Sequence, residues 1–114
     1  MTLAWQPLAG PDLHRFIDAL PGRVLLMFGS RACGTCRAAQ ARVPSLVDGH
    51  VDALVYVDAE VQTALVREYE VFHLPALFLF RAGRYHAPLH APLTAGEFGR
   101  AIDTALAGPA QEAP

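Results

Sequence analysis

Long hydrophobic runs and clusters of basic residues are both missing from this sequence. No stretch is long enough to span a bilayer, and a net charge of −2 gives no support to nucleic-acid binding. The first residues lack the basic and apolar segments of a signal peptide, so we expect a protein of the reducing cytoplasm. Internal repeats and linkers are absent too, which predicts one domain, 1–108, and a flexible tail, 109–114.

Cysteine is scarce, since Cys33 and Cys36 are the only two in the chain. An apolar run at 24–28 precedes them and predicts a buried strand, and a helical stretch follows them. The sulfur of Cys33 is therefore expected at a helix N-terminus, where free N–H groups and the helix dipole stabilise a thiolate. Cys36 falls one turn further in and should be more buried. This arrangement suits a redox dithiol, with Cys33 as nucleophile and Cys36 as resolving thiol.

Two other interpretations of the cysteine pair remain open, namely inert core cysteines or one half of a zinc site. A zinc site needs four ligands and usually a second pair of Cys or His residues. Among the five histidines, only His86 and His90 form even a loose pair. The sequence therefore favours redox chemistry and predicts no metal.

Strand and helix patterns alternate in the order β-α-β-α-β-α-β-β-α, which predicts an α/β fold with a central mixed sheet and helices on both faces. We expect strands at 3–6, 23–28, 53–58, 76–80 and 84–87, and helices at 11–20, 33–47 and 61–69. A last helix should start at a capping box formed by Thr94 and Glu97.

Four residues carry more detailed expectations about these elements. Pro44 should kink or interrupt the second helix, because it lacks an N–H group. Pro88 should restrict the last strand to a short or edge position. Val61 should lie on the buried face of the third helix, and Trp5 should pack on the first.

This order of elements, with Cys33-Gly34-Thr35-Cys36 after the first long buried strand, resembles thioredoxin. The stretch 69–84 resembles the thioredoxin segment that contains a cis-proline, a buried strand and a hairpin, and Pro75 falls on the cis-proline position. The resemblance covers nearly the whole chain. It implies the thioredoxin fold.

The resemblance also implies a substrate-binding surface around Cys33. A cis Pro75 beside the dithiol would expose the carbonyl and N–H groups of Leu74 to an extended peptide. The other residues of this surface would be Ala32, Gly34 and Thr35. Arg31 and His73 are candidate modulators, because a positive charge near Cys33 would lower the pKa of its thiol. A solvent-facing position is favoured for His73, and the steering of partners for Arg31.

Several positions depart from the thioredoxin pattern. Ala32 replaces the usual Trp, Met27 replaces a buried Asp, and Tyr56 replaces the Lys that partners this Asp. The deprotonation of Cys36 therefore lacks the carboxylate thought to assist it. Thr35 is a candidate for orienting a water or for a hydrogen bond to a sulfur.

The resemblance implies a thiol–disulfide oxidoreductase that reduces protein disulfides, in electron transport and cellular redox homeostasis. It would be a monomer without a bound cofactor, its disulfide re-reduced by a flavoenzyme of the thioredoxin-reductase type. The alternative is a protein-binding or chaperone-like module with little redox turnover. A glutaredoxin-like role is weaker, since only Arg31 and Arg37 offer charges for glutathione.

Overall fold

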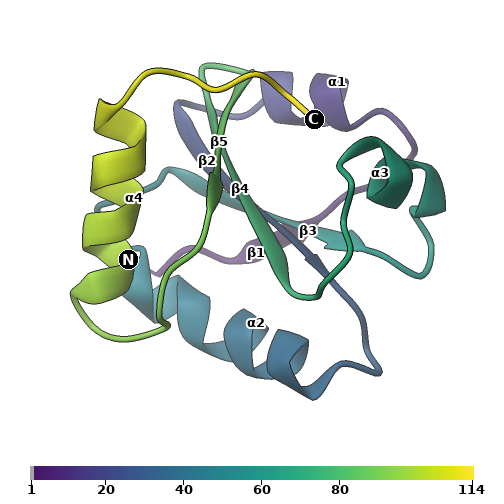
Figure 1. The fold of residues 1–114 in the computed structure, drawn as a ribbon, viewed down its shortest axis with the longest axis horizontal. Coiled ribbons are helices and arrows are strands. Elements are labelled where there is room, and N and C mark those ends of the chain that lie inside the picture. Colours follow the sequence, from purple (N-terminus) through teal and green to yellow (C-terminus); the bar gives the residue numbers. More distant parts are fainter. Residues whose placement is uncertain (1) are drawn as a thin grey trace.

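The helices and strands of the computed structural model, which describes residues 2–114, follow the predicted order (Figure 1). The strands are β1 (Trp5–Pro7), β2 (Arg23–Gly29), β3 (Ala53–Asp58), β4 (Ala76–Arg81) and β5 (Arg84–Leu89). The helices are α1 (Leu13–Asp18), α2 (Gly34–Leu46), α3 (Thr63–Glu68) and α4 (Glu97–Ala107). Across residues 2–114, no helix combines the length and apolar character that crossing a membrane requires.

The five strands form one mixed sheet in the order β1-β3-β2-β4-β5. β1, β3 and β2 run parallel, whereas β4 is antiparallel to both β2 and β5. Phe28 near the end of β2 pairs with Ala76 at the start of β4. Since the two strands are antiparallel, the segment that follows β2 and the segment that precedes β4 lie together at the same end of these two strands.

Helices cover both faces of the sheet (Figure 1), as the sequence predicted. Successive side chains of a strand point to opposite faces, and β2 is buried on both. Leu26 and Phe28 pack with residues of α1 and α3. Leu25 and Met27 pack with residues of α2 and α4. The apolar run of β2 therefore joins two separate hydrophobic cores.

The expected position of Trp5 needs correction, whereas a kink at Pro44 stays a prediction. Pro44 lies inside α2, which is not interrupted. Trp5 packs on the face covered by α2 rather than on α1, and its Nε1–H donates to the carbonyl oxygen of Gln40 at 2.8 Å. Gln40 is four residues before Pro44, so its carbonyl is the one that Pro44 cannot bond. Trp5 supplies the donor that Pro44 lacks.

Two predicted helix starts are also wrong. α3 begins at Thr63, so Val61 lies before the helix with 71% of its surface exposed. α4 begins at Glu97 after Gly96, which has a φ of 86°. The hydroxyl of Thr94 donates to the Glu97 carboxylate at 3.0 Å instead of capping a backbone N–H group. Both starts therefore lack the side-chain cap that makes a helix start recognisable in a sequence.

The last strand lies at the edge of the sheet, as predicted, although it extends through Pro88 to Leu89. An edge strand tolerates proline because one side of its backbone forms no ladder. The N–H group of Gln111 donates to the carbonyl oxygen of His86 at 2.6 Å, so part of the segment 109–114 lies along β5. The flexibility of this tail stays a prediction.

Candidate functional site

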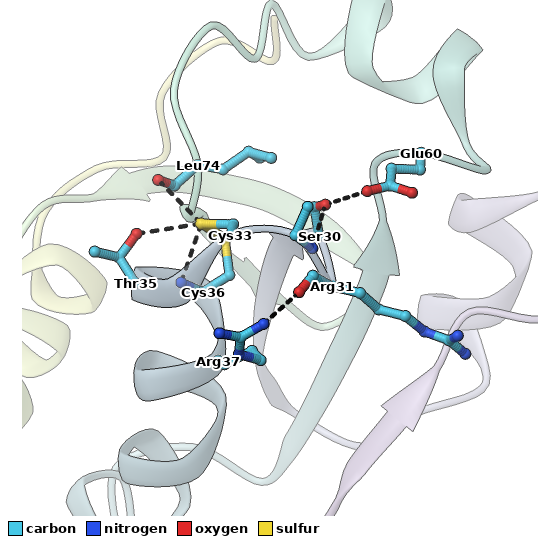
Figure 2. Close-up of a disulfide and its surroundings, with 9 residues drawn as sticks. Ser30, Arg31, Cys33, Thr35, Cys36, Arg37, Glu60 and Leu74 are labelled. Atoms are coloured by element: carbon cyan, nitrogen blue, oxygen red, sulfur yellow. Dashed lines mark hydrogen bonds between the residues drawn. A yellow bond between two sulfur atoms is a disulfide. The ribbon is translucent and has the colours of Figure 1, made fainter.

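Cys33 and Cys36 lie at the start of α2 and form a disulfide (Figure 2). Cys33 is the N-cap residue of the helix, and its sulfur accepts the backbone N–H of Cys36 at 3.1 Å. Cys33 is partly exposed, whereas Cys36 is 1% exposed. One sulfur can therefore meet a partner while the other is shielded behind it.

The segment before β4 forms the other side of the site. The peptide bond between Leu74 and Pro75 is cis, the geometry that the resemblance predicts. The carbonyl oxygen of Leu74 lies 3.9 Å from the sulfur of Cys33, although 41 positions separate the two residues in the chain. The pairing of β2 with β4 thus brings the dithiol and the proline together.

Three further residues of the expected binding surface surround the sulfur of Cys33. Ala32, Gly34 and Thr35 are all exposed. The hydroxyl of Thr35 lies 3.2 Å from the Cys33 sulfur, and the space around the Cα of Gly34 is open. Residues at the start of α2 therefore leave Cys33 open to a partner at Gly34.

Neither Arg31 nor His73 forms a hydrogen bond to the sulfurs in the part of the chain that the structure describes. The guanidinium of Arg31 points away from the sulfurs (Figure 2), and its carbonyl oxygen accepts a hydrogen bond from Arg37 at 2.7 Å. His73 is exposed in the segment before Pro75. Their modulating role stays a prediction.

Two largely apolar cavities flank Pro75. The larger has a volume of about 400 Å³, and its walls include Phe72, His73 and Pro88. The smaller has a volume of about 260 Å³ and includes Ala39 of α2. Phe72, at the larger cavity, is 85% exposed. Apolar side chains of a bound polypeptide would find room on both sides of the cis-proline.

The position of the missing carboxylate is filled by an apolar contact. Met27, which is fully buried, stands opposite Tyr56 in the pairing of β2 with β3. A side chain at Gly29 would meet the ring of Tyr56 at 3.0 Å, so the ring lies directly on the backbone of β2. Burial, and then the carboxylates of Asp58 and Glu60, raise the pKa of the Tyr56 hydroxyl. The core beneath α2 therefore holds a thioether and a neutral phenol.

Sequence reasoning missed a hydrogen-bonded pair beside the dithiol. Ser30 is 7% exposed, and its hydroxyl donates to the carboxylate of Glu60 (Figure 2). The same hydroxyl oxygen accepts the N–H group of Ala32 at 3.2 Å. Ser30 could have been noticed in the sequence, because it is a polar residue at the end of an apolar run just before the cysteines. No local pattern marks Glu60.

No metal site is seen in the described part of the chain, residues 2–114, where no group of three or more His, Cys, Asp or Glu residues could hold an ion. The ring of His86 is engaged elsewhere, because its Nε2 lies 2.9 and 3.1 Å from the carbonyl oxygens of Ala105 and Gly108. The donor set of the site is two sulfurs, a hydroxyl and backbone groups. Such a set suits reversible disulfide exchange.

Comparisons with known proteins agree with this geometry. A family model for thioredoxin matches residues 8–104. A mutant thioredoxin from Halobacterium salinarum superposes with a TM-score of 0.70 at 21% identity, over 97% of this chain and 95% of that one. Mitochondrial thioredoxin 3 from Saccharomyces cerevisiae gives a TM-score of 0.64 at 17% identity, over 90% and 91%. The thioredoxin fold predicted from the sequence is confirmed.

A longer protein shares the fold as well. The zinc-bound form of human ERp44 gives a TM-score of 0.70 at 13% identity, and the match covers 90% of this chain but 30% of the ERp44 chain. No curated protein sequence matches the chain. At these sequence identities, the structural similarity shows the fold alone.

Proposed function

The chain belongs to the thioredoxin family, and from this premise we propose that it reduces disulfide bonds in other proteins. A thioredoxin domain with a disulfide at this position supports a thiol–disulfide oxidoreductase in general terms, without a bound cofactor. One observation carries the more specific proposal. The partly exposed Cys33 sulfur is bonded to the buried Cys36 and faces the carbonyl oxygen of Leu74 at 3.9 Å.

The reaction begins in the reduced protein with the thiolate of Cys33. The thiolate attacks one sulfur of the substrate disulfide, a bond forms between Cys33 and that sulfur, and the other substrate sulfur leaves and takes a proton from solvent. The N–H group of Cys36 and the first turn of α2 stabilise the attacking thiolate. The hydroxyl of Thr35, 3.2 Å away, is a second donor.

Cys36 completes the reaction. Its thiolate attacks the sulfur of Cys33, the internal disulfide forms again, and the second substrate sulfur leaves as a thiol. Two electrons have then passed from the dithiol to the substrate. Since Met27 replaces the carboxylate and Cys36 is 1% exposed, we expect the deprotonation of Cys36 to limit this second step.

The substrate would bind as an extended segment beside Leu74. Its backbone would pair with the exposed backbone groups of this residue, as in the addition of a strand to a sheet. The two cavities beside Pro75 would take neighbouring apolar side chains. Such binding is tolerant of sequence, which fits a reductase with several protein substrates.

The cellular setting belongs to the proposal as well. For this chain we propose a flavoenzyme of the thioredoxin-reductase type as the reductant, a monomeric state and a cytoplasmic location.

Two single variants test the reaction, with a disulfide-bonded protein such as insulin as substrate and dithiothreitol as reductant. Cys33→Ser should abolish the catalysed reduction. Cys36→Ser should retain the first attack and accumulate a mixed disulfide that mass spectrometry detects. Wild-type protein that adds nothing to the rate with dithiothreitol alone would contradict the proposal.

A protein-binding module with little turnover is the second candidate. The exposed Phe72 beside an apolar cavity favours it, together with the absence of the buried carboxylate. The reduction potential of the Cys33/Cys36 couple separates a reductase from an oxidant or isomerase, and partner binding by a variant without the dithiol tests the module. A value near or below about −250 mV supports a reductase, and one of about −120 to −180 mV supports an oxidant or isomerase. Partner binding that is undiminished in Cys33→Ser/Cys36→Ser would support the module.

A further inference from the structure

We propose that Ser30 and Glu60 are positioning residues for Cys33. The hydrogen bond between their side chains would hold the backbone before Cys33 so that its sulfur meets the N–H group of Cys36. This inference rests on the proposed function, because it assumes that Cys33 is the attacking thiolate. It adds two residues outside the Cys-x-x-Cys motif to the machinery that sets the reactivity of Cys33.

Ser30 binds both backbone N–H groups that precede the reactive sulfur. Its side-chain oxygen accepts the N–H group of Ala32 at 3.2 Å, and its carbonyl oxygen accepts that of Cys33 at 3.2 Å. Ser30 is 7% exposed, so water does not compete freely for these bonds. The turn between β2 and α2 is therefore organised around one buried serine.

Glu60 fixes the direction of the serine hydroxyl. A hydroxyl has a single proton to donate, and a carboxylate only accepts, so the Ser30 proton points to Glu60. A lone pair of the hydroxyl oxygen then remains for the N–H group of Ala32. Bonds to an ionised partner are stronger than neutral ones. The carboxylate thereby holds the serine in the one arrangement that binds the turn.

Glu60 is itself held against β2. The carbonyl oxygen of Gly29 accepts the N–H group of Ala59 at 2.9 Å, and the carboxylate of Asp58 accepts the N–H group of Glu60 at 2.9 Å. The carboxylate therefore belongs to the segment that continues β3, the strand next to β2 in the sheet. Figure 2 shows Glu60 and Leu74 approaching the Ser30–Cys33 segment from separate parts of the chain.

A positioning role and a simple charge effect predict opposite changes in the pKa of the Cys33 thiol. If the pair positions the turn, its loss weakens the bond between the Cys33 sulfur and the Cys36 N–H group, and the pKa rises. If Glu60 acted only as a nearby negative charge, its removal would stabilise the thiolate and the pKa would fall.

Four variants distinguish the two roles: Ser30→Ala, Glu60→Ala, the double variant and Glu60→Gln. In the reduced proteins, the rate of alkylation by iodoacetamide as a function of pH gives the pKa of Cys33. We expect a higher pKa in Ser30→Ala and Glu60→Ala, with attack on a disulfide substrate at pH 7 slowed about fivefold, the scale expected when one hydrogen bond to the thiolate is weakened rather than lost. Glu60→Gln keeps an acceptor for the serine and should restore most of the rate.

The double variant tests whether the two side chains act together. It should be no slower than Ser30→Ala, because the bond between Ser30 and Glu60 is already lost in that variant. Glu112→Ala is the matched control, since it removes an exposed carboxylate in the tail and should react like the wild type.

Two results would overturn the inference. One is an unchanged pKa in Ser30→Ala, and the other is an equal fall in pKa in Glu60→Ala and Glu60→Gln. A wild-type protein that fails to reduce any disulfide substrate would instead contradict the proposed function.

Discussion

The indole N–H of Trp5 donates to the carbonyl oxygen of Gln40 at 2.8 Å, across 35 positions of the chain. This carbonyl lacks its usual helical donor, because the residue four positions later is Pro44. The contact satisfies a backbone group on the helix that carries the dithiol. It also ties edge strand β1 to α2.

A double-mutant cycle of Trp5 and Pro44 measures this relationship. Trp5→Phe removes the donor and should lower the free energy of unfolding by about 1–3 kcal/mol, the cost of a lost partner for a shielded carbonyl. In a Pro44→Ala background the loss should be smaller, because the alanine supplies its own N–H group to Gln40. Urea denaturation of the four proteins gives the coupling. Strictly additive losses would show that the indole bond does not replace the missing helical one.

Met27→Asp restores the carboxylate that the thioredoxin pattern leads one to expect. Met27 is fully buried and faces Tyr56 rather than a lysine, so the new carboxyl would lack a cation and its pKa would rise. Stability should fall by about 2–4 kcal/mol. Because this carboxyl would have a higher pKa in the folded than in the unfolded protein, the variant becomes less stable as the pH rises above the unfolded-state pKa near 4. The loss of stability should therefore be larger at pH 8 than at pH 5.

The neutral variant Met27→Asn is the control for Met27→Asp. It should be destabilised to a similar extent at both pH values, as measured by urea denaturation. If Met27→Asp followed the same course, the new carboxylate would have found a partner or solvent, and the description of this core as apolar would be wrong.

An ion pair between the first residue of β2 and the residue before β3 should make stability depend on pH. The guanidinium of Arg23 binds the Asp52 carboxylate through Nε and Nη2 at 3.1 Å, and its hydrogen bonds, with that of the Arg23 backbone, lower the pKa of Asp52. Because the pKa of Asp52 is lower in the folded than in the unfolded protein, the ion pair stabilises the fold at pH values above the unfolded-state pKa near 4. This stabilisation is lost as the pH falls through the folded-state pKa.

Asp52→Asn removes this contribution. Since both side chains are partly exposed, we expect a loss of up to about 1 kcal/mol at pH 7, and a smaller loss at pH 2, because protonation of the wild-type carboxyl at low pH removes the same charge. Urea denaturation at both pH values tests it. A difference that is equal at the two pH values would mean that the charge of Asp52 is not what stabilises the strand ends.

Tyr69 carries a buried hydroxyl among aromatic rings. The hydroxyl has no hydrogen-bond partner among the described residues, and burial, followed by Glu68 and Tyr85, raises its pKa to about 12. Tyr69→Phe should be neutral or stabilising by up to about 1 kcal/mol at pH 7. Because the pKa of Tyr69 is higher in the folded than in the unfolded protein, stability is unaffected at pH values below the unfolded-state pKa near 10. Stability falls as the pH rises from there towards 12.

The alkaline loss should therefore be smaller in Tyr69→Phe than in the wild type. Free energies of unfolding between pH 9 and 11.5 test this, with absorbance of the phenolate as a second readout. Tyr85→Phe is the matched control, because burial also raises the pKa of Tyr85, but less. Equal alkaline losses in wild type and Tyr69→Phe would place the ionising group elsewhere.

The features that the sequence predicted correctly are those with a local pattern. Apolar runs marked β2, β3 and β4, and the position of the cysteines after β2 placed Cys33 at a helix start. The partners of Ser30 and Trp5 could not be predicted, because they lie 30 and 35 positions away and follow no periodicity. The direction of the Arg31 side chain could not be predicted either, since an exposed arginine has many rotamers of similar energy.

Because β2 pairs with β3 and β4, we expect that the protein can be divided into two complementary fragments. A cut in the exposed turn at Asp48–Gly49 would leave Cys33 on one fragment and Pro75 on the other, and neither would hold a whole site. The strand β2 of the first fragment fits between β3 and β4 of the second. Fused to two proteins that bind each other, the fragments would report that association through the recovery of disulfide exchange.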